Sequence, residues 1–429
     1  MKRKNLLLQW IVILTCAVLL PTGCADKNKT TDNTDKYSAV TRDLIDIVEG
    51  DAQLKALLEK AIANGKAINP DTITNPAQTL DKYYEFIEHS VKAMPWSVLN
   101  LPDSTYSIFN KINQALCYLC FINGMPLEEL EGQSLCTNSI QYTEPYRTWL
   151  IDFTKAWGEY LSTTDSWNDE YLKAVQADPD FGLQKGWYED PSNWKTFNDF
   201  FARELSSPAA RPIAEPDNDA VVVSYADSEP EGVWAINDSS QIVQKEGVAI
   251  KSKAYNSVAD LIGPNSKYRD AFAGGTLTHS FLNVHDYHWY HFAMGGTIKE
   301  INVIPGDDAI GGYITWNEAE KRYMVDCSTP GWQTIETRGC VIVETEQYGL
   351  VALLPVGMSQ VSSVNFDKSL KVGDKVKKGD KLGYFLFGGS DFAMVFQRGV
   401  KFELTAPTND KGRWEHILMG EELGRLTKE

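Results

Sequence analysis

The chain has 429 residues, of which 43% are hydrophobic and 23% are charged, as expected of a globular protein with a large core. Its formal net charge is −17. Because no excess of Lys and Arg is available to neutralise phosphates, this charge excludes nucleic-acid binding and electrostatic adhesion to anionic membranes.

The N-terminus predicts export. Basic residues 2–4 precede an apolar stretch at 6–20, which has signal-peptide length and is shorter than a membrane-spanning helix. Cys24 follows a small residue, and this pattern resembles a bacterial lipoprotein signal, although a plain secretory signal or a short anchor would give a similar pattern. We therefore expect a signal peptide at 1–24, a lipid on Cys24 and a polar tether at 25–37. The protein would then be an exported, membrane-anchored lipoprotein of a bacterial cell envelope.

Residues 38–185 have the pattern of a helical domain. Apolar residues recur at helical spacing from its start, as in Val40, Leu44 and Val48. Further helices are expected at 80–94, 107–121 and 146–161. We find no chemistry-bearing cluster in this half, so its expected role is to cap, position or select.

The cysteines do not predict a disulfide scaffold. Five remain after Cys16 and Cys24, and an odd number cannot pair completely in an exported protein. Cys117 and Cys120 form a Cys-x-x-Cys pattern, but they lie in an apolar, helical-looking stretch. We interpret them as buried thiols on a helix and not as a redox or metal motif.

Residues 186–429 change to a β-rich pattern. A short amphipathic helix is expected at 194–205, followed by short β-rich runs between Gly, Asp and Asn turns. These runs are 221–225, 298–305, 340–346, 350–356 and 381–387. Because no long amphipathic helix separates them, we predict an α+β fold: a helical domain followed by a mostly antiparallel, β-rich catalytic domain.

Several residues in this second half could carry nucleophilic chemistry. Ser390 follows two glycines, and four of the six histidines lie between positions 279 and 291. Asp227 follows an apolar run and is expected to be buried. A serine, a histidine pair and a buried aspartate in one domain are the residue types of an activated nucleophile.

An ordered set of segments carries a family resemblance. The segments are 197–212, Tyr225-Ala226-Asp227-Ser228, Asp286-Tyr287-His288-Trp289-Tyr290-His291, Pro355-Val356-Gly357-Met358, and 376–385 leading into Gly388-Gly389-Ser390. Together they resemble the phosphatidylserine decarboxylase family of pyruvoyl enzymes. The preceding helical domain is similar to the branch that includes fungal tryptophan decarboxylases.

The resemblance implies self-cleavage between Gly389 and Ser390. The Ser390 hydroxyl would attack the Gly389 carbonyl, and the serine would become a pyruvoyl group that caps a new chain. By resemblance, His291 is the base and Asp227 orients it. For His288 we predict the role of proton donor during turnover, since an imidazole titrates near neutral pH.

Two departures from the family pattern affect these expectations. Ser228 follows Asp227 where the family usually has glycine, so the turn there is expected to differ. Asp391 follows the serine where the family usually has Ser or Thr. A carboxylate beside the scissile bond is expected to disfavour the oxyanion of self-cleavage.

The resemblance also implies partners and cofactors. The pyruvoyl group would replace PLP, and no metal is expected. The cleaved chains are expected to stay associated, and a homo-oligomer is compatible with the sequence. Phosphatidylserine is the expected substrate, because a lipid anchor raises the local concentration of a lipid. The alternative substrate is a free aromatic amino acid such as tryptophan, which would suit the extra helical domain.

Other interpretations remain open at this stage. His288 and His291 could bind zinc, but they lack the usual glutamate or cysteine companions, and we take His279 and His285 as bystanders. Residues 372–384 also resemble the hairpin of biotinyl carrier domains. The sequence contains no Gly-x-Ser-x-Gly nucleophile elbow, so it does not indicate an ordinary serine hydrolase. A further alternative is an inactive lipoprotein that keeps the fold as a binding module.

Overall fold

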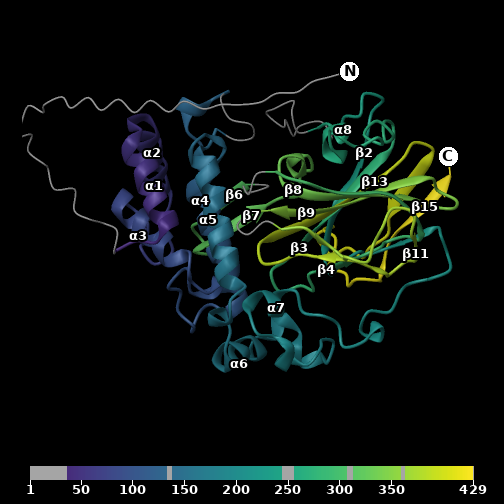
Figure 1. Ribbon diagram of the computed structural model, residues 1–429, viewed down its shortest axis with the longest axis horizontal. Helices are drawn as coiled ribbons and strands as arrows, with labels where there is room; N and C mark the ends of the chain where they lie inside the picture. The colour runs from purple at the N-terminus through teal and green to yellow at the C-terminus, as the bar shows by residue number, and fades with distance from the viewer. Residues whose placement is uncertain (1–35, 133–137, 244–255, 307–312, 359–362, 429) are drawn as a thin grey trace, which may run out of the picture. The chain divides into compact units, whose positions relative to one another are not determined.

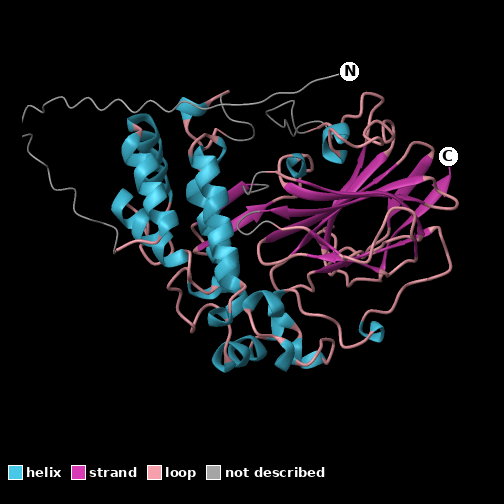
Figure 2. Ribbon diagram, viewed as in Figure 1, coloured by secondary structure: helices cyan, strands magenta, loops and turns pink. Residues whose placement is uncertain are grey.

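Helices make up most of the N-terminal part of the chain and strands make up most of the C-terminal part, as Figures 1 and 2 show. The computed structural model describes residues 36–132, 138–243, 256–306, 313–358 and 363–428. The predicted signal peptide, the lipid site Cys24 and nearly all of the tether lie outside these residues, so they remain predictions. Among the described residues, no helix is both long and apolar enough to cross a membrane.

The N-terminal part is helical, as predicted. Its helices are α1 (Ala39–Gly50), α2 (Ala52–Ile68), α3 (Leu80–Ser90), α4 (Ile108–Asn123), α5 (Tyr146–Leu161) and α6 (Asp169–Ala177). Side chains cap several of their starts: Ser107, for example, accepts a hydrogen bond from the backbone N–H of Asn110 at the beginning of α4. Residues 114–123 of α4 are all buried. A helix buried on every face must be covered on several sides, so α4 lies inside the molecule.

Helix α4 is fastened to the β-rich part of the chain. The Gln114 side chain donates to the Tyr323 carbonyl over 3.0 Å and accepts from the Tyr323 N–H over 2.7 Å. Asn69 adds a hydrogen bond of 2.8 Å to the Tyr323 hydroxyl. Residues 38–429 form one compact unit. The predicted domain boundary between 185 and 186 therefore remains a prediction.

The largest sheet has seven strands in the order β11-β5-β8-β9-β13-β3-β2, and every neighbouring pair is antiparallel. Their bounds are β11 (Lys375–Val376), β5 (Gly296–Ile304), β8 (Thr337–Glu344), β9 (Leu350–Met358), β13 (Gly389–Phe396), β3 (Thr276–Leu282) and β2 (Glu229–Ala235). The α+β prediction is confirmed. Sequence reasoning did not foresee β13, whose first residues are the glycine and serine of the predicted cleavage site.

Three smaller sheets complete the described part of the fold. They are β1 (Val221–Val223) with β15 (Glu422–Lys428) and β14 (Val400–Leu404); β10 (Asn365–Phe366) with β12 (Lys381–Tyr384) and β4 (Trp289–His291); and β6 (Tyr313–Asn317) with β7 (Arg322–Asp326). Residues 372–384 do not pair as a simple carrier-type hairpin, because β11 pairs with β5 and β12 pairs with β4 and β10.

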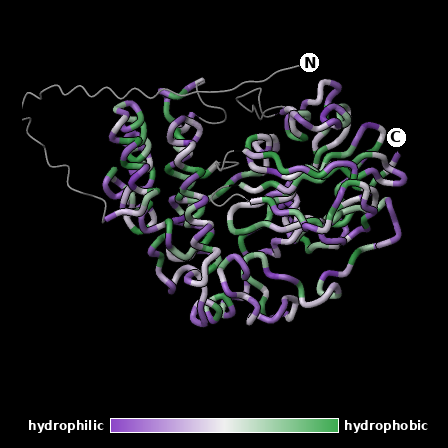
Figure 3. The backbone as a smooth tube through the Cα atoms, in the orientation of Figure 1, coloured by the Kyte–Doolittle hydropathy of each residue, from purple (hydrophilic) through white to green (hydrophobic). Residues whose placement is uncertain are grey.

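The hydrophobic core lies on both faces of the seven-stranded sheet. Figure 3 shows hydrophobic stretches running along its strands. On β13, Phe392, Met394 and Phe396 belong to one buried cluster, and Ala393 and Val395 belong to another. This alternation is the period of two that a strand imposes on its side chains. It also decides where the residues of the cleavage site point. Two short helices, α7 (Phe197–Phe201) and α8 (Val258–Ile262), complete the described helices.

Candidate active site

Ser390 is the second residue of β13, an inner strand of the seven-stranded sheet, and its environment is unusual. It is fully buried, and its Oγ has no hydrogen-bond partner among the described residues. Leaving a buried hydroxyl unsatisfied costs about 1–3 kcal/mol, so such a group calls for a functional explanation. The strand period places Ser390 on the same face as Phe392.

The two glycines before Ser390 are required by the backbone. Gly388 has φ 149°, which residues with a side chain rarely adopt. A Cβ on Gly389 would lie 2.6 Å from Cγ of Met358. The chain therefore enters β13 through a turn that glycine alone fits comfortably. The peptide bond before Ser390 lies directly at this turn.

His291 is a buried, neutral imidazole. Its Nδ1–H donates to the Gly379 carbonyl over 2.8 Å, because a carbonyl can only accept. The other nitrogen, Nε2, lies 3.1 Å from the Tyr287 hydroxyl and acts as acceptor. Burial lowers the pKa of His291 to about 4. A neutral ring with a basic Nε2 is the form that a general base needs.

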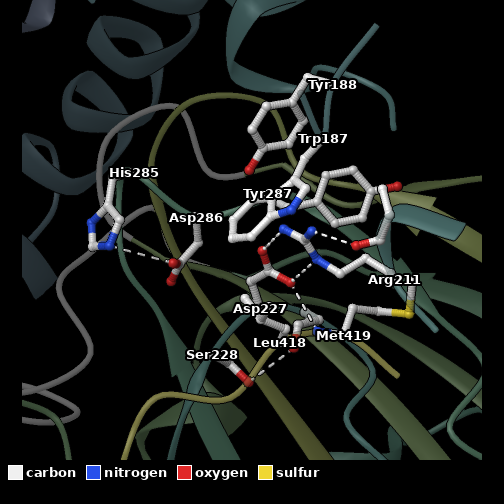
Figure 4. Close-up of polar contacts among 12 residues, drawn as sticks. Trp187, Tyr188, Arg211, Asp227, Ser228, His285, Asp286, Tyr287, Leu418 and Met419 are labelled. Carbon is white, nitrogen blue, oxygen red and sulfur yellow. Dashed lines mark hydrogen bonds and ion pairs between the residues drawn. The ribbon is translucent and has the colours of Figure 1, made fainter. Parts of the chain in front are cut away.

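Asp227 is held by Arg211 and not by His291. The Arg211 guanidinium donates to both carboxylate oxygens, over 2.9 Å and 2.5 Å, and the Met419 N–H donates over 2.8 Å. Figure 4 shows this pairing, with Trp187 and Tyr287 beside the guanidinium. The predicted direct contact between Asp227 and His291 is therefore not what the structure shows, since the carboxylate is occupied by a stronger, bidentate partner.

His288 lies in an apolar environment. Its ring stacks on Phe201 with centroids 3.8 Å apart, and Phe201 in turn contacts Phe387, the residue before the Gly388 turn. Neither ring nitrogen makes a hydrogen bond of normal geometry among the described residues. Burial lowers the pKa of His288 to about 3. As a proton donor, this imidazole would need a nearby negative charge, such as a substrate carboxylate, to raise its pKa.

The structure does not join Ser390 to either histidine by a hydrogen bond. Tyr290 and Phe292 belong to the buried cluster that contains Phe392. His291 lies between them on the chain, and it lines a polar pocket together with Arg211 and Tyr287. Activation of Ser390 by His291 therefore remains a prediction, and in this conformation it would require a local rearrangement.

The next residue, Asp391, points to the opposite face of β13. Its fully buried carboxylate lies 2.8 Å from Nδ1 of His279 and accepts from the Gln333 amide over 3.4 Å. The expectation that Asp391 would disfavour the oxyanion is therefore unsupported by the geometry. Strand alternation turns its side chain away from the Ser390 hydroxyl. His279 pairs with this carboxylate, which gives the residue a structural role, and its absence from catalysis stays a prediction.

The His279 imidazole is held at both nitrogens. Besides Asp391, it contacts the Ser328 carbonyl through Nε2 over 3.2 Å, and its ring stacks on Trp234. Burial alone would lower the pKa of His279, but the Asp391 carboxylate outweighs it and the net pKa is raised. Nearby Glu231 is largely buried, and burial raises its pKa to about 7. The reverse face of the strand thus carries a compact, paired acid–base cluster.

Sequence reasoning missed the partners that hold these groups. Arg211 was noted only as part of a motif, and the buried Asp286 was not singled out. Asp286 accepts from the His416 Nε2–H over 2.8 Å, and this ion pair lowers the pKa of Asp286 despite its burial. His416 lies beyond the resembling segments, so no sequence signal connected it to the site.

The geometry gives no support to the zinc interpretation. Among the described residues, no group of three or more His, Cys, Asp or Glu side chains is arranged to hold a metal ion. His288 packs against Phe201, whereas His291 bonds to Gly379 and Tyr287. The two histidines therefore lie in separate environments and do not form one ligand set.

A comparison with known protein families shows which family the chain belongs to. Residues 197–425 match the model of the phosphatidylserine decarboxylase family. This chain belongs to the phosphatidylserine decarboxylase family. The match contains all four predicted catalytic residues: Asp227, His288, His291 and Ser390. The resemblance found in the sequence is thereby confirmed.

Several curated proteins are similar to the chain. Phosphatidylserine decarboxylase proenzyme 2 of Oryza sativa subsp. japonica is 32% identical over 243 residues, which are 56% of this chain and 36% of that protein. The phosphatidylserine decarboxylase proenzyme of Fusobacterium nucleatum is 30% identical over 63% of this chain and 83% of its own length. Decarboxylase iboD of Amanita muscaria is 26% identical over 68% of this chain and 89% of its own length. The chain thus spans about a third of the rice protein.

The phosphatidylserine decarboxylase family is pyruvoyl-dependent, and the residues around Ser390 fit such a group. The hydroxyl is buried without a partner, and a glycine turn leads into it. Both are properties of a serine placed for reaction with its own backbone.

Proposed function

We propose that the chain is a pyruvoyl-dependent decarboxylase that generates its cofactor from Ser390. The observation that carries the proposal is the buried, unpartnered Ser390 hydroxyl at the start of β13, directly after a glycine turn. A structural serine at the centre of a sheet would hydrogen-bond or be replaced by an apolar residue. Membership of a pyruvoyl-dependent family supports the same conclusion.

Self-cleavage can be written from the chain's own atoms. The Ser390 Oγ attacks the Gly389 carbonyl carbon, the C–N bond breaks, and an ester forms. β-Elimination removes the Cα proton of residue 390 and breaks its Cβ–O bond, which leaves Gly389 with a free carboxylate and residue 390 as dehydroalanine. Water then replaces the nitrogen of residue 390, which leaves as ammonia. His291, neutral above its pKa of about 4, is the proposed base for the first step.

Turnover is proposed to take place at the same end of β13. A pyruvoyl carbonyl supplies an electron sink for decarboxylation of a bound amine, the role that PLP has in other enzymes. We propose that neither PLP nor a metal is required. His288 holds the proton that replaces the carboxylate, once a substrate carboxylate near the ring raises its pKa.

The two chains are proposed to stay together after cleavage. The C-terminal fragment would contain β13, which pairs with β9 on one side and β3 on the other. It would also contain β14 and β15, and β15 pairs with β1 of the larger fragment. Separation would break both edges of a central strand and expose its buried side chains, which is strongly unfavourable.

Phosphatidylserine is the proposed substrate, with phosphatidylethanolamine as the product. The names of the Oryza and Fusobacterium relatives support this assignment. We also propose that Cys24 carries a lipid and that residues 25–37 tether the enzyme to a bacterial membrane. A single lipid chain holds a protein only reversibly, whereas a multiply acylated cysteine anchors it stably near a lipid substrate.

Vesicles test the substrate and the anchor together. The anchored protein and a soluble Cys24→Ala form, exported by a different signal, are given phosphatidylserine vesicles, and CO₂ release is measured. We expect both forms to release CO₂ and the anchored form to do so faster at low lipid concentration. If vesicle phosphatidylserine is untouched by both forms, the lipid assignment is wrong.

A further inference from the structure

An apolar pocket lies against the residue that precedes Ser390. Three separate parts of the chain build it: α4, the β6–β7 pair, and the sheet around the scissile bond. The residues that define it are Leu116, Cys117, Ile314, Val325, Met358 and Gly389. We call it the side-chain pocket. Because Gly389 is part of its wall, the pocket lies directly beside the Gly389–Ser390 bond.

The size of the side-chain pocket limits what can enter. Its cavity volume is about 40 Å³. A water-sized occupant takes up roughly 10–15 Å³ of such volume, so there is room for about three or four non-hydrogen atoms. A short branched aliphatic group matches this space. An indole ring has nine non-hydrogen atoms, more than this volume holds.

The chemistry of the walls also selects. In the uncleaved chain, hydrocarbon and sulfur groups dominate the lining, with Asn113 and Asn283 as its polar side chains. A phosphodiester in this pocket would lose its hydration without a positive partner, which is very costly. An aliphatic group gains about 0.8 kcal/mol for each CH₂ that it buries. The headgroup of phosphatidylserine must therefore lie outside the side-chain pocket.

The outer wall is fixed in place by specific contacts. Gln114 of α4 bonds to both backbone groups of Tyr323 on β7, two residues before Val325. Helix α4 lies outside the matched family segment 197–425. The helical part of this chain thus contributes a rigid wall beside the scissile bond, where it can act on substrate choice.

We propose that the side-chain pocket receives the side chain of a free amino acid with a short branched aliphatic group, such as leucine or valine. This gives the enzyme a second substrate class beside phosphatidylserine. The inference rests on the proposed function, because only a processed Ser390 supplies the reactive carbonyl. In the reaction the bond between Cα and the carboxylate breaks, CO₂ leaves, and one proton takes its place on Cα to give the primary amine.

Adjacent positions on β7 offer a matched pair of variants. Val325 lines the pocket, whereas Met324 points to the other face and is 40% exposed. Val325→Phe fills the pocket, and Met324→Phe adds the same ring outside it. Ile314→Phe on β6 is a second filling variant, for the case that Val325→Phe does not fold.

Binding is measured first, on the uncleaved Ser390→Ala protein. Saturation-transfer NMR should show contact between the protein and the methyl groups of leucine, and little contact with the indole of tryptophan. Adding Val325→Phe should remove the leucine signal, and adding Met324→Phe should keep it. Absence of leucine contact, or contact that survives both filling variants, would overturn the inference. This arm does not depend on cleavage.

Turnover is measured second, on the processed protein. We expect CO₂ release from leucine and a kcat/KM at least about tenfold lower in Val325→Phe, the loss typical when a small apolar pocket no longer fits its group. Intact mass should show that Val325→Phe still cleaves itself. A wild-type protein that never cleaves itself would contradict the proposed function. A cleaved protein whose leucine turnover is unchanged in both filling variants would contradict only the proposed role of the side-chain pocket.

Discussion

The two faces of strand β13 place adjacent residues in opposite chemical situations. On one face the Ser390 hydroxyl is buried without a partner. On the other face the Asp391 carboxylate is buried with His279 and Gln333 as partners. The unsatisfied nucleophile and the satisfied ion pair therefore belong to two adjacent residues of the chain. The strand period of two makes this separation possible.

The difference explains how the chain can be cleaved near the start of β13 while the strand keeps its place in the sheet. Cleavage before Ser390 would make that residue a chain terminus, and termini fray unless they are tied down. The Asp391–His279 pair holds the strand at the next position, on the face opposite the Ser390 hydroxyl. One face of β13 thus holds the unsatisfied Ser390 hydroxyl, and the opposite face holds the ion pair that keeps the strand in place.

The largest expected effect is on self-cleavage at Ser390. His291→Ala should slow self-cleavage by about 10²–10⁴-fold, because the proposed base is lost. Asp227→Asn should slow it as well, through the loss of the charge that pairs with Arg211. Cleavage is followed on denaturing gels over time. Cleavage at the wild-type rate in His291→Ala would show that another group activates the serine.

His288→Ala should separate turnover from processing. We expect this variant to cleave itself, because His288 makes no hydrogen bond of normal geometry in the uncleaved chain. Turnover should then fall by about 10²–10⁴-fold if His288 holds the transferred proton. The readout is CO₂ release per cleaved molecule. Normal turnover would place the proton donor elsewhere.

Asp391 should affect the cleaved enzyme more than the cleavage itself. In Asp391→Ala, His279 loses its partner, and we expect the pyruvoyl end to fray and kcat to fall by up to about 10²-fold, the cost of misplacing reacting groups by about 1 Å. Asp391→Asn keeps a hydrogen-bond acceptor for His279 and should recover most of the activity. Hydrogen exchange of β13 after cleavage gives an independent measure. Equal exchange in Asp391→Ala and wild type would contradict the anchoring role.

The buried histidines should also differ in the sign of their pH dependence. The pKa of His279 is raised by Asp391, so its contribution to the free energy of unfolding is complete below about pH 6.5 and is lost as the pH rises through the raised pKa. The pKa values of His288 and His291 are lowered by burial to about 3 and 4, so their contribution is present above about pH 6.5 and is lost as the pH falls.

Denaturant unfolding at several pH values checks these signs. The stability gap between wild type and Asp391→Asn should shrink as the pH rises, and the gap between wild type and His288→Phe should shrink as the pH falls from about 6.5. Gaps that do not change with pH, or that change in the opposite sense, would contradict the assigned protonation states.

Local patterns in the sequence predicted much of the fold and part of the site. Helix α5 has the bounds that the apolar spacing indicated, and the runs at β5, β8 and β9 are strands. Ser390, His288 and His291 are buried, as candidate catalytic groups should be. These results follow from short-range periodicity and from motif order, which a sequence displays directly.

The pairings across the fold could not be read from the sequence. His279 and Asp391 are 112 positions apart, and only the register of β3 against β13 brings them together. The bidentate hold of Arg211 on Asp227 depends in the same way on tertiary packing. Local pattern alone places the Asp391 carboxylate beside the oxyanion, whereas strand alternation turns it to the opposite face.

The central claim is that Ser390 breaks the chain and becomes its new end. Intact-mass measurement on the purified protein tests it most directly, with Ser390→Ala as the control. The account predicts two fragments that stay associated under native conditions, the smaller one spanning residues 390–429 and beginning with a pyruvoyl group, and a whole chain in Ser390→Ala. A wild-type protein that remains one uncleaved chain would contradict the account and favour an inactive binding module on the same fold.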